Sequence, residues 1–453
     1  MGVRAHAITA VVFATLLAGS AWAAPKEQPR LREIATAADP AQLRASIEAL
    51  VSFGTRHTLS DTASPTRGIG AARRWAQSRF EQISRDCGSC LVVFTPSQSV
   101  TGPRAPAGAE IVDVVAIQKG SSDPERAVVL TGHIDSRVTD VMNANADAPG
   151  ADDDASGVAV VLEAARILSR YKFQATIVYG VLSGEEQGLY GGKLLADYAG
   201  LQHWRVEADL NNDIVGASVG QNGVADNTRV RLFSEGTRDT ETAEDAKHRR
   251  FEGGENDSAS RNVARYAKSV AEAYIPNWTV ALVYRLDRFG RGGDHSAFNA
   301  DGYPAVRFSE NAEDYRHQHQ DLRTEGGVAY GDTIDHVDFN YLARVAATNM
   351  LAAAAMASAP APPGQVKIAG AVTPDTQLTW SAAPASSDVS YRVYWRDTTE
   401  PGWTHSKDAG TAGSLTLMNV SLDDWAFGVA SVSADGYESP VVFPGPAGAF
   451  PAP

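Results

Sequence analysis

Acidic and imidazole side chains gather in three short clusters between Thr131 and Glu186. The clusters read TGHIDS around His133, APGADDDASG around Asp153, and SGEEQG around Glu185. The first and the third follow apolar, β-branched runs of the kind that form buried strands. Charge at the end of a buried strand is costly unless it is paired, hydrogen-bonded or bound to metal. Because ligands of open α/β sheets bind beyond the carboxyl ends of the strands, these clusters indicate a metal-bearing active site.

Taken singly, each cluster has a simpler explanation. His133 and Asp135 lie two residues apart and share a face of a strand, so they could be only a hydrogen-bonded pair. Three adjacent aspartates could be an acidic loop, and two glutamates a surface pair. Three such clusters in succession favour a cation site, in which Asp135 holds one ring nitrogen of His133 while the other nitrogen binds metal.

The elements that must position these clusters follow from apolar periodicity. Strands are expected at residues 90–94, 111–117, 127–131, 176–182 and 305–308, and helices from residue 40 and over 69–83, 156–171 and 339–356. The polar stretch 236–262 is interpreted as a solvated loop. Strand, helix and strand in alternation predict an α/β fold with a mostly parallel central sheet sandwiched by helices.

The N-terminus reads as an export signal. A weakly basic start, a short apolar run and Ala21-Trp22-Ala23 predict a signal peptide over residues 1–23, with an uncleaved anchor as the alternative. We therefore expect a secreted or periplasmic protein. No later segment approaches the length of a membrane span.

Two further features of the composition are the cysteine pair and the net charge. Export favours a disulfide between Cys87 and Cys90 over a redox motif, and no second cysteine pair exists to complete a structural zinc site. The formal net charge of −14 speaks against broad nucleic-acid binding.

The composition changes after residue 356. Residues 357–364 form a Pro/Ala stretch of the kind that links domains. Residues 365–453 alternate in short β-like runs separated by turn-formers, which predicts a small all-β sandwich. This tail resembles a fibronectin type III domain, with Trp380 in an early core position and Trp425 where a tyrosine is usual. By analogy it is a module that binds substrate or a surface, or else a spacer.

Two further motifs complete a family pattern. The order H-x-D, GADDDASG, GEEQG, N-x-D-x-x-G at Asn211 and H-x-x-x-D at His317 resembles the M28 family of zinc-dependent peptidases. The likeness covers roughly residues 43–356, which would form the peptidase domain (24–356 with its flanks), and is strongest to secreted bacterial leucyl aminopeptidases with two zinc ions. The resemblance implies the zinc-exopeptidase type of α/β fold.

The same resemblance implies a ligand for each metal position. Asp153 would bridge two Zn²⁺ ions, His133 and Asp213 would complete one site, and Glu186 and His317 the other. Two zinc ions about 3.5–4 Å apart lower the pKa of a shared water and polarise the scissile carbonyl.

Further roles carry over in the same way. Glu185 would be the general base, Asp135 the partner of His133, and Asp321 the residue that orients His317. The family pattern also implies a cis peptide after Asp153.

Departures from the pattern leave alternatives open. His319 could replace His317 as the last ligand, although the H-x-x-x-D spacing favours His317. Arg316 stands where relatives often carry tyrosine, which leaves the oxyanion donor open. Asp294 and His295 match another family motif, with a structural role and a role near the substrate weighed equally.

The expected function is a dizinc aminopeptidase that removes bulky apolar residues from the N-termini of peptides or proteins. The apolar preference rests on the resemblance alone. A glutaminyl cyclase or a carboxypeptidase on the same fold, and a non-catalytic binding protein on a peptidase scaffold, remain as alternatives.

Overall fold

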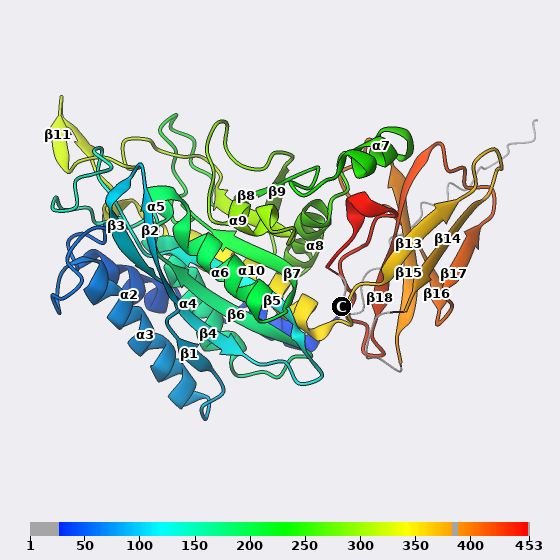
Figure 1. Cartoon of the computed structure of the whole chain (residues 1–453), viewed down its shortest axis with the longest axis horizontal. Helices are drawn as coiled ribbons and strands as arrows, with labels where there is room; N and C mark the ends of the chain where they lie inside the picture. The colour runs from blue at the N-terminus through cyan, green and yellow to red at the C-terminus, as the bar shows by residue number, and fades with distance from the viewer. Residues whose placement is uncertain (1–26, 383–387, 452–453) are drawn as a thin grey trace, which may run out of the picture.

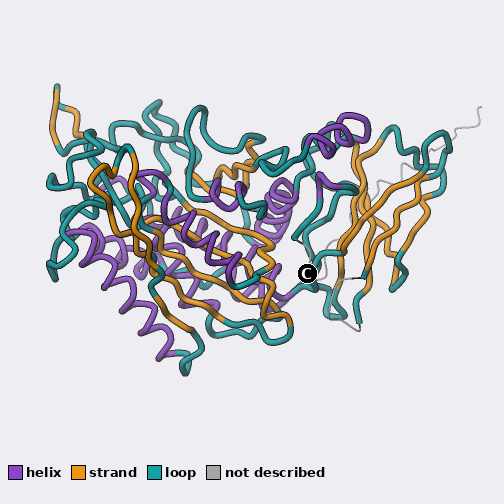
Figure 2. Tube along the Cα trace, viewed as in Figure 1, coloured by secondary structure: helices purple, strands orange, loops and turns teal. Residues whose placement is uncertain are grey.

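The computed structural model describes residues 27–382 and 388–451. The predicted signal peptide, residues 1–23, lies outside the described residues. Figure 1 shows a large α/β part that continues into a smaller part built from β-strands, and Figure 2 shows the helices massed around the larger sheet. No helix among the described residues is long and apolar enough to cross a membrane.

A mixed eight-stranded sheet forms the centre of the α/β part. Its strands, in spatial order, are β1 (Val92–Phe94), β4 (Val114–Gln118), β6 (Ala175–Leu182), β5 (Asp123–His133), β7 (Arg205–Asn212), β10 (Ala305–Glu310), β8 (Arg229–Ser234) and β9 (Thr279–Val283). Parallel pairing joins β6, β5, β7 and β10 in the middle, and β8 with β9 at one edge. The predicted α/β class with a largely parallel sheet is confirmed.

Helices cover both faces of this sheet. One face packs against α1 (Pro29–Ala35), α2 (Pro40–Val51), α3 (Gly68–Asp86), α4 (Ala155–Leu168), α8 (Ala259–Tyr274) and α10 (Phe339–Ser358). The other face packs against α6 (Tyr190–Leu201) and α9 (His295–Ala300). Alternate residues of the central strands feed the two cores, as the two-residue period of a strand requires.

Further short elements lie outside this sheet. They are the hairpins β2 (Ser97–Gly102) with β3 (Ala105–Val112) and β11 (Arg323–Glu325) with β12 (Val328–Tyr330), and the helices α5 (Glu185–Gly188), α7 (Ala243–Glu252), η1 (Ile334–His336) and η2 (Pro446–Gly448).

Most predicted elements appear close to their expected bounds. The helix expected from residue 40 begins where Asp39 accepts a hydrogen bond from the backbone N–H of Ala41 at 2.9 Å. The strand expected at 111–117 is divided between β3 and β4, because Asp113 between them turns its carboxylate to the N–H of Ser183 at 2.9 Å. The predicted disulfide between Cys87 and Cys90 is present just after α3.

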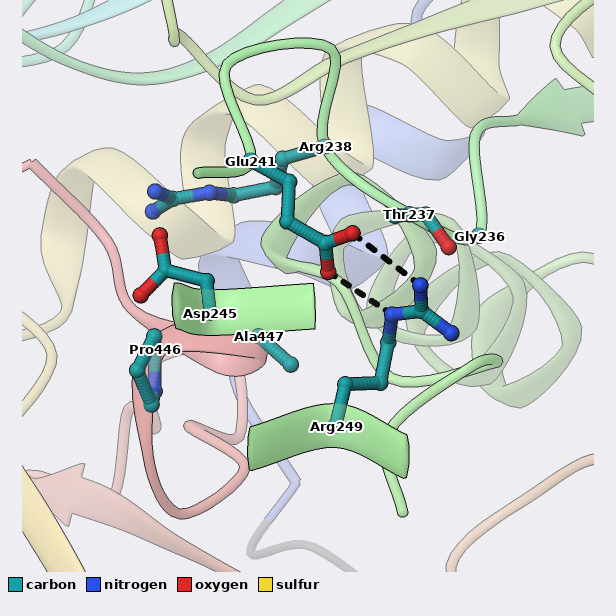
Figure 3. A pocket seen from close by; sticks show the side chains of 8 residues that line it. All are labelled: Gly236, Thr237, Arg238, Glu241, Asp245, Arg249, Pro446 and Ala447. Carbon is teal, nitrogen blue, oxygen red and sulfur yellow. Dashed lines mark hydrogen bonds and ion pairs between the residues drawn. The ribbon is translucent and has the colours of Figure 1, made fainter. Parts of the chain in front are cut away.

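The interpretation of residues 236–262 as a loop was wrong, since α7 lies inside it. This helix has no buried residue, so its sequence carries no apolar stripe from which a helix could be predicted. A reciprocal cap between Thr242 and Asp245 starts it, and a twofold ion pair joins Arg249 to Glu241 (Figure 3). The pocket in that view, between α7 and η2, holds about 10 Å³, which is room for a water molecule.

The C-terminal part consists of two three-stranded antiparallel sheets. One contains β13 (Gly364–Ala369), β14 (Thr376–Ser381) and β17 (Ser414–Leu417), and the other β16 (His405–Gly410), β15 (Ser390–Asp397) and β18 (Trp425–Val432). Side chains of both sheets share one core that includes Leu378, Val393 and Phe427. This agrees with the expected small β-sandwich, and its assignment as a fibronectin type III domain stays a prediction.

The smaller part is attached to the larger one through buried charged groups. Arg396 of β15 donates twice to Asp257 at 2.7 and 2.8 Å, and Arg265 of α8 donates to the same carboxylate at 2.9 Å. Arg265 also donates to the carbonyl of Pro401, and Tyr266 to that of Glu438. The two parts therefore share a desolvated ion cluster rather than touching only through their connection.

The segment predicted as a linker is held against the large sheet. Helix α10 extends to Ser358, two residues into that segment. The buried Arg126 donates to the carbonyls of Met356 and Ala359, and Gln174 donates to that of Ser358. These bonds fix the start of the segment before β13 begins.

Candidate metal centre

The three sequence clusters meet at one edge of the central sheet. His133 ends β5, Glu185 and Glu186 follow β6, and Asp213 follows β7. These three strands are parallel neighbours, so their carboxyl ends lie together. Asp153 joins them from the turn before α4.

Two glycines let the start of α4 enter between the strand ends. A Cβ atom on Gly132 would lie 2.7 Å from the backbone of Gly157, and one on Gly157 would lie 2.4 Å from the carbonyl oxygen of Asn212. Any larger side chain at these positions would push the helix away from β5 and β7. The close approach places the aspartates of the turn beside His133.

The three adjacent aspartates have three different surroundings. Asp154 caps α4 by accepting from the N–H of Gly157 at 2.8 Å, and it also accepts from the N–H of His133 at 2.9 Å. Asp152 accepts from the N–H of Gly216 at 2.6 Å. Asp153 is left to face the histidines, and the peptide bond that follows it is cis, as the family pattern implied.

The side chains that could hold metal form two groups that Asp153 connects. The groups are His133, Glu185 and Asp213, and Asp153, Glu186 and His319, each with ligand atoms within 4.8 Å of one another. One oxygen of Asp153 lies 3.2 Å from Nε2 of His133, and the other lies 2.9 Å from Nε2 of His319. A carboxylate with one oxygen toward each group has the geometry of a bridge between two cations.

The structure places His319, and not the predicted His317, in the second group. Nε2 of His319, not of His317, lies 3.0 Å from Glu186 and 2.9 Å from Asp153. His317 instead stacks on His336 with ring centroids 3.4 Å apart. Its Nδ1 lies 3.2 Å from the carbonyl of Gly331. His319 has a left-handed backbone, with φ of 52°, and no regular element contains it, so residue spacing alone could not identify the ligand.

Asp321, predicted to orient His317, has other contacts in the structure. Within the described residues, no hydrogen bond or ion pair joins its carboxylate to His317 or His319. Its backbone N–H donates to Thr139, and the residue lies exposed just before β11. Nδ1 of His319 lies instead 2.6 Å from a guanidinium nitrogen of Arg137.

Asp135 does more than accompany His133. Its carboxylate lies 3.5 Å from Nδ1 of His133, and its backbone carbonyl lies 3.1 Å from the same nitrogen. The carboxylate also accepts from the N–H groups of Glu185 and Glu186 at 3.3 and 3.1 Å, and from Thr58 at 2.8 Å. One buried aspartate thus links the imidazole of one group to the backbone that carries both glutamates.

The electrostatics of the centre favour bound cations. Burial lowers the pKa of His319, but the carboxylates of Glu186 and Asp153 outweigh it and raise the pKa to about 10. Burial raises the pKa of Asp153, yet His319 and His133 bring it well below its ordinary value. The carboxylates therefore draw positive charge onto the histidines. Imidazole nitrogen and carboxylate oxygen are zinc ligands, so the donor set fits two zinc ions.

Glu185 has the properties expected of a proton acceptor. Burial raises the pKa of its carboxyl well above the ordinary value; His133 opposes this shift, and the charges of Glu186 and Asp213 add to it. It lies beside Glu186 on the first turn of α5 and lines the cavity that opens over the centre. A carboxylate in this position can take a proton from a water held at the centre.

Arginines support the ligands, and the sequence analysis missed them. Arg307, fully buried in β10, lies 2.8 Å from Asp213 and 2.8 Å from Asp287. Arg137 donates to Glu186 at 2.8 Å. Arg137 follows the H-x-D motif by two residues, and Arg307 belongs to a predicted strand. Neither arginine is part of a sequence motif that predicts a functional residue.

Asp294 and His295 lie close to the centre without joining either metal group. Asp294 accepts from the N–H of Gly192 at 3.1 Å, and burial raises its pKa to about 7. Nε2 of His295 lies 3.0 Å from the carbonyl of Leu286. These contacts tie the loop before α9 to α6 and to the segment just after β9.

Comparison with known proteins identifies the family. Residues 113–351 match the model of peptidase family M28. The chain is 44% identical over 424 residues to a probable zinc metalloprotease of Leptosphaeria maculans, covering 93% of this chain and 98% of that protein. It is 45% identical over 417 residues to a probable zinc metalloprotease of Pyricularia oryzae, covering 90% and 83%. These relatives are fungal proteins.

Solved structures show the same fold at low identity. The LapA aminopeptidase of Legionella pneumophila superposes with a TM-score of 0.54 at 19% identity, covering 74% of this chain and 76% of that one. LapB of the same organism gives 0.52 at 18%, covering 72% and 74%. The segment that matches the family model, residues 113–351, contains the strand ends, the α4 turn and both candidate metal groups. By this match and its fungal relatives, the chain belongs to the zinc metalloproteases of peptidase family M28.

Proposed function

We propose that this protein is a dizinc aminopeptidase of the M28 family. The observation that carries the proposal is the position of Asp153, whose two oxygens face His133 and His319 at 3.2 and 2.9 Å. We assign His133 and Asp213 to one zinc ion, Glu186 and His319 to the other, and Asp153 to both. Bound zinc would acidify a water molecule and polarise the scissile carbonyl.

The side chains of the chain supply the remaining chemistry. Glu185 accepts a proton from the water and returns it to the leaving amine, since its pKa is raised and it faces the cavity. Asp135 keeps Glu185 and Glu186 in place through their backbone N–H groups. Arg307 fixes the orientation of Asp213 by a contact of 2.8 Å.

Three finer expectations also stay proposals. They are export through the N-terminal segment, a fibronectin type III identity for the C-terminal part, and a role of that part in binding substrate or a surface. The expected preference for bulky apolar residues has little support from the cavity, whose lining has few apolar side chains.

The proposal is tested by metal analysis together with activity on Leu-p-nitroanilide. We expect about two zinc ions per chain, release of p-nitroaniline that stops on chelation, and recovery on adding zinc. N-acetyl-Leu-p-nitroanilide should resist hydrolysis, because an aminopeptidase requires a free N-terminal amine. Activity that survives complete removal of metal would overturn the zinc mechanism, and cleavage of the acetylated substrate at an equal rate would overturn the exopeptidase assignment.

A further inference from the structure

A cavity of about 640 Å³ opens over the metal centre, and basic side chains form much of its wall. Four arginines line it, namely Arg104, Arg137, Arg288 and Arg291. They come from three distant parts of the sequence: Arg104 from the turn between β2 and β3, Arg137 from the loop after β5, and the other two from the loop before α9. The fold thus collects positive charge around the place where a substrate must lie.

Much of the carboxylate charge around this wall is already engaged. Glu313 lies behind it and accepts from Arg231, Arg288 and Arg291, as well as from Gln318 at 3.0 Å. The arginine pairs on the cavity side are long, at 3.4 Å each. Arg288 also pairs with Asp287 at 3.1 Å, and Asp287 is itself shared with Arg307. Two carboxylates shared among four guanidinium groups leave an excess of positive charge on the cavity side.

Arg104 has no carboxylate partner within the described residues. Its guanidinium donates to the backbone carbonyl of Glu186 at 2.8 Å, and the residue is exposed. It therefore lines the cavity directly beside a proposed zinc ligand. Arg291 lies beside the same group, because it contacts Gln318, the neighbour of His319, at 3.3 Å.

The net charge of the cavity lining depends on whether zinc is bound. Four carboxylates line the cavity with the four arginines, namely Asp153, Glu185, Glu186 and Asp213. These are the ligands and the base, and two zinc ions would offset their charge. Asp287 and Glu313 behind the wall offset only part of what remains, so the loaded cavity is positive. Such a cavity concentrates anionic substrates.

The cavity has little surface that suits a bulky apolar side chain. Leu189 and Tyr315 are the large apolar or aromatic residues of the described lining, and Tyr315 is 57% exposed. The remaining wall is polar, charged or glycine. Selection of leucine-like residues requires an apolar pocket, which these two side chains do not enclose.

We propose that the cavity selects substrates that carry a carboxylate next to the scissile peptide bond, held by Arg104 and Arg291. The inference rests on the proposed aminopeptidase function. The carboxylate can belong to an acidic side chain of the N-terminal residue or to the C-terminus of a dipeptide. Both sources present the same planar anion, which guanidinium groups bind through paired hydrogen bonds.

Matched substrate pairs separate the two sources. Glu-p-nitroanilide and Gln-p-nitroanilide have nearly the same shape and differ in side-chain charge. Leu-Leu and Leu-Leu-amide differ in the terminal carboxylate. We expect kcat/KM to be about tenfold or more higher for the charged member of at least one pair, and the pair that responds identifies the source.

Three variants assign the effect to the wall. Arg104→Gln and Arg291→Gln should each lower the charged-to-neutral ratio by about fivefold or more. Arg285→Gln is the matched control, because Arg285 is exposed in the same loop as Arg291 but does not line the cavity. It should leave the ratio unchanged within about twofold. Raising the ionic strength for the unmodified enzyme should lower the same ratio, since salt screens partly exposed charges.

The outcomes separate this inference from the proposed function. Chelator-sensitive hydrolysis with ratios near or below one in both pairs would overturn the carboxylate preference and leave the aminopeptidase proposal standing. A preference that persists in both arginine variants would overturn the assignment to Arg104 and Arg291. No zinc-dependent hydrolysis of any of the four substrates would overturn the underlying function.

Discussion

The guanidinium of Arg307 in β10 lies 2.8 Å from the carboxylate of Asp213, which directly follows the neighbouring strand β7. The same guanidinium lies 2.8 Å from Asp287, so one buried cation orients two buried carboxylates. Asp213 thereby presents a fixed orientation to the zinc site proposed for it and His133. Outer contacts of this kind commonly govern how tightly a metal is held.

Replacing this arginine should therefore weaken one zinc site and the fold together. We expect Arg307→Met to retain about one zinc ion per chain after dialysis against a zinc buffer in which the unmodified protein keeps two. Because Asp287 would be left buried without its main partner, the free energy of unfolding should fall by about 3–5 kcal/mol. Metal analysis and denaturant unfolding measure the two effects. Arg307→Lys, which keeps the charge, should recover part of both, and full retention of both zinc ions by Arg307→Met would contradict the role assigned here.

The choice between the two neighbouring histidines gives a second prediction. His319→Ala should lose the zinc ion shared with Glu186 and reduce kcat by about a hundredfold or more, because a metal ligand is removed. His317→Ala should keep both zinc ions and most of the activity, since His317 contacts His336, Gly331 and Asp314 and neither metal group. Metal content and kcat on Leu-p-nitroanilide distinguish them. Loss of zinc and activity in His317→Ala but not in His319→Ala would instead identify His317 as the ligand, as the H-x-x-x-D spacing predicts.

A third prediction concerns proton transfer. Glu185→Gln should bind both zinc ions normally and lower kcat by about 10²–10⁴-fold, because glutamine cannot accept the proton of the water. Glu186→Gln is the comparison, since the substitution there should reduce metal binding as well. A Glu185→Gln enzyme that turns over at the normal rate would remove Glu185 from the mechanism.

The fourth prediction is a pH dependence of stability. Burial raises the pKa of Glu235 from its ordinary 4.5 to about 7; Ser260 and the N–H of Asp239 oppose the shift, as does Arg238. The folded state therefore keeps a proton that the unfolded chain loses first. Stability should fall as pH rises from about 4.5 to 7, and the loss should be complete above that range.

Glu235→Gln should remove this component, since glutamine carries no titrating proton. Unfolding by urea at pH 5 and pH 8 should show the variant gaining about 2–3 kcal/mol relative to the unmodified protein between the two values. Glu244→Gln on the exposed helix α7 is the control. A difference between Glu235→Gln and the unmodified protein that does not change with pH would show that the carboxyl is ionised throughout.

The fifth prediction concerns the smaller β-part. Arg396→Met should lower the stability of the whole chain by about 3–5 kcal/mol, because Asp257 and Arg265 are buried and share its charge. A chain ending at Pro363 should likewise unfold at lower denaturant than the full chain. Denaturant unfolding followed by tryptophan fluorescence tests both. Unchanged stability in the shortened chain would show that the larger part stands alone.

The fold and much of the centre could be predicted because they rest on local patterns. Apolar runs identified β5 and β6, and the clusters at their ends contained His133, Asp153 and Glu186. The last ligand could not be predicted in this way. His319 lies in an irregular segment with a left-handed backbone, where no period relates position to direction.

The supporting charges were missed for a different reason. Arg307 and Asp213 are 94 residues apart, and only the pairing of β10 with β7 brings them together. Helix α7 was missed because it buries no residue, so its start depends on the cap at Thr242 and not on an apolar face. Contacts of long sequence separation and helices without a core face leave no periodic trace in a single sequence.

Because Glu313 has several partners at once, its contacts restrict which substitutions relatives of this protein can accept. Its carboxylate accepts from Arg231, Arg288, Arg291 and Gln318 together. A change at position 313 alone would remove the carboxylate that Arg231 and Arg291 share, while Arg288 would keep Asp287. Substitutions at these positions should therefore be inherited as a set. A lineage that abandons a basic cavity wall should lose Glu313 together with Arg288 and Arg291, while the zinc ligands stay as they are.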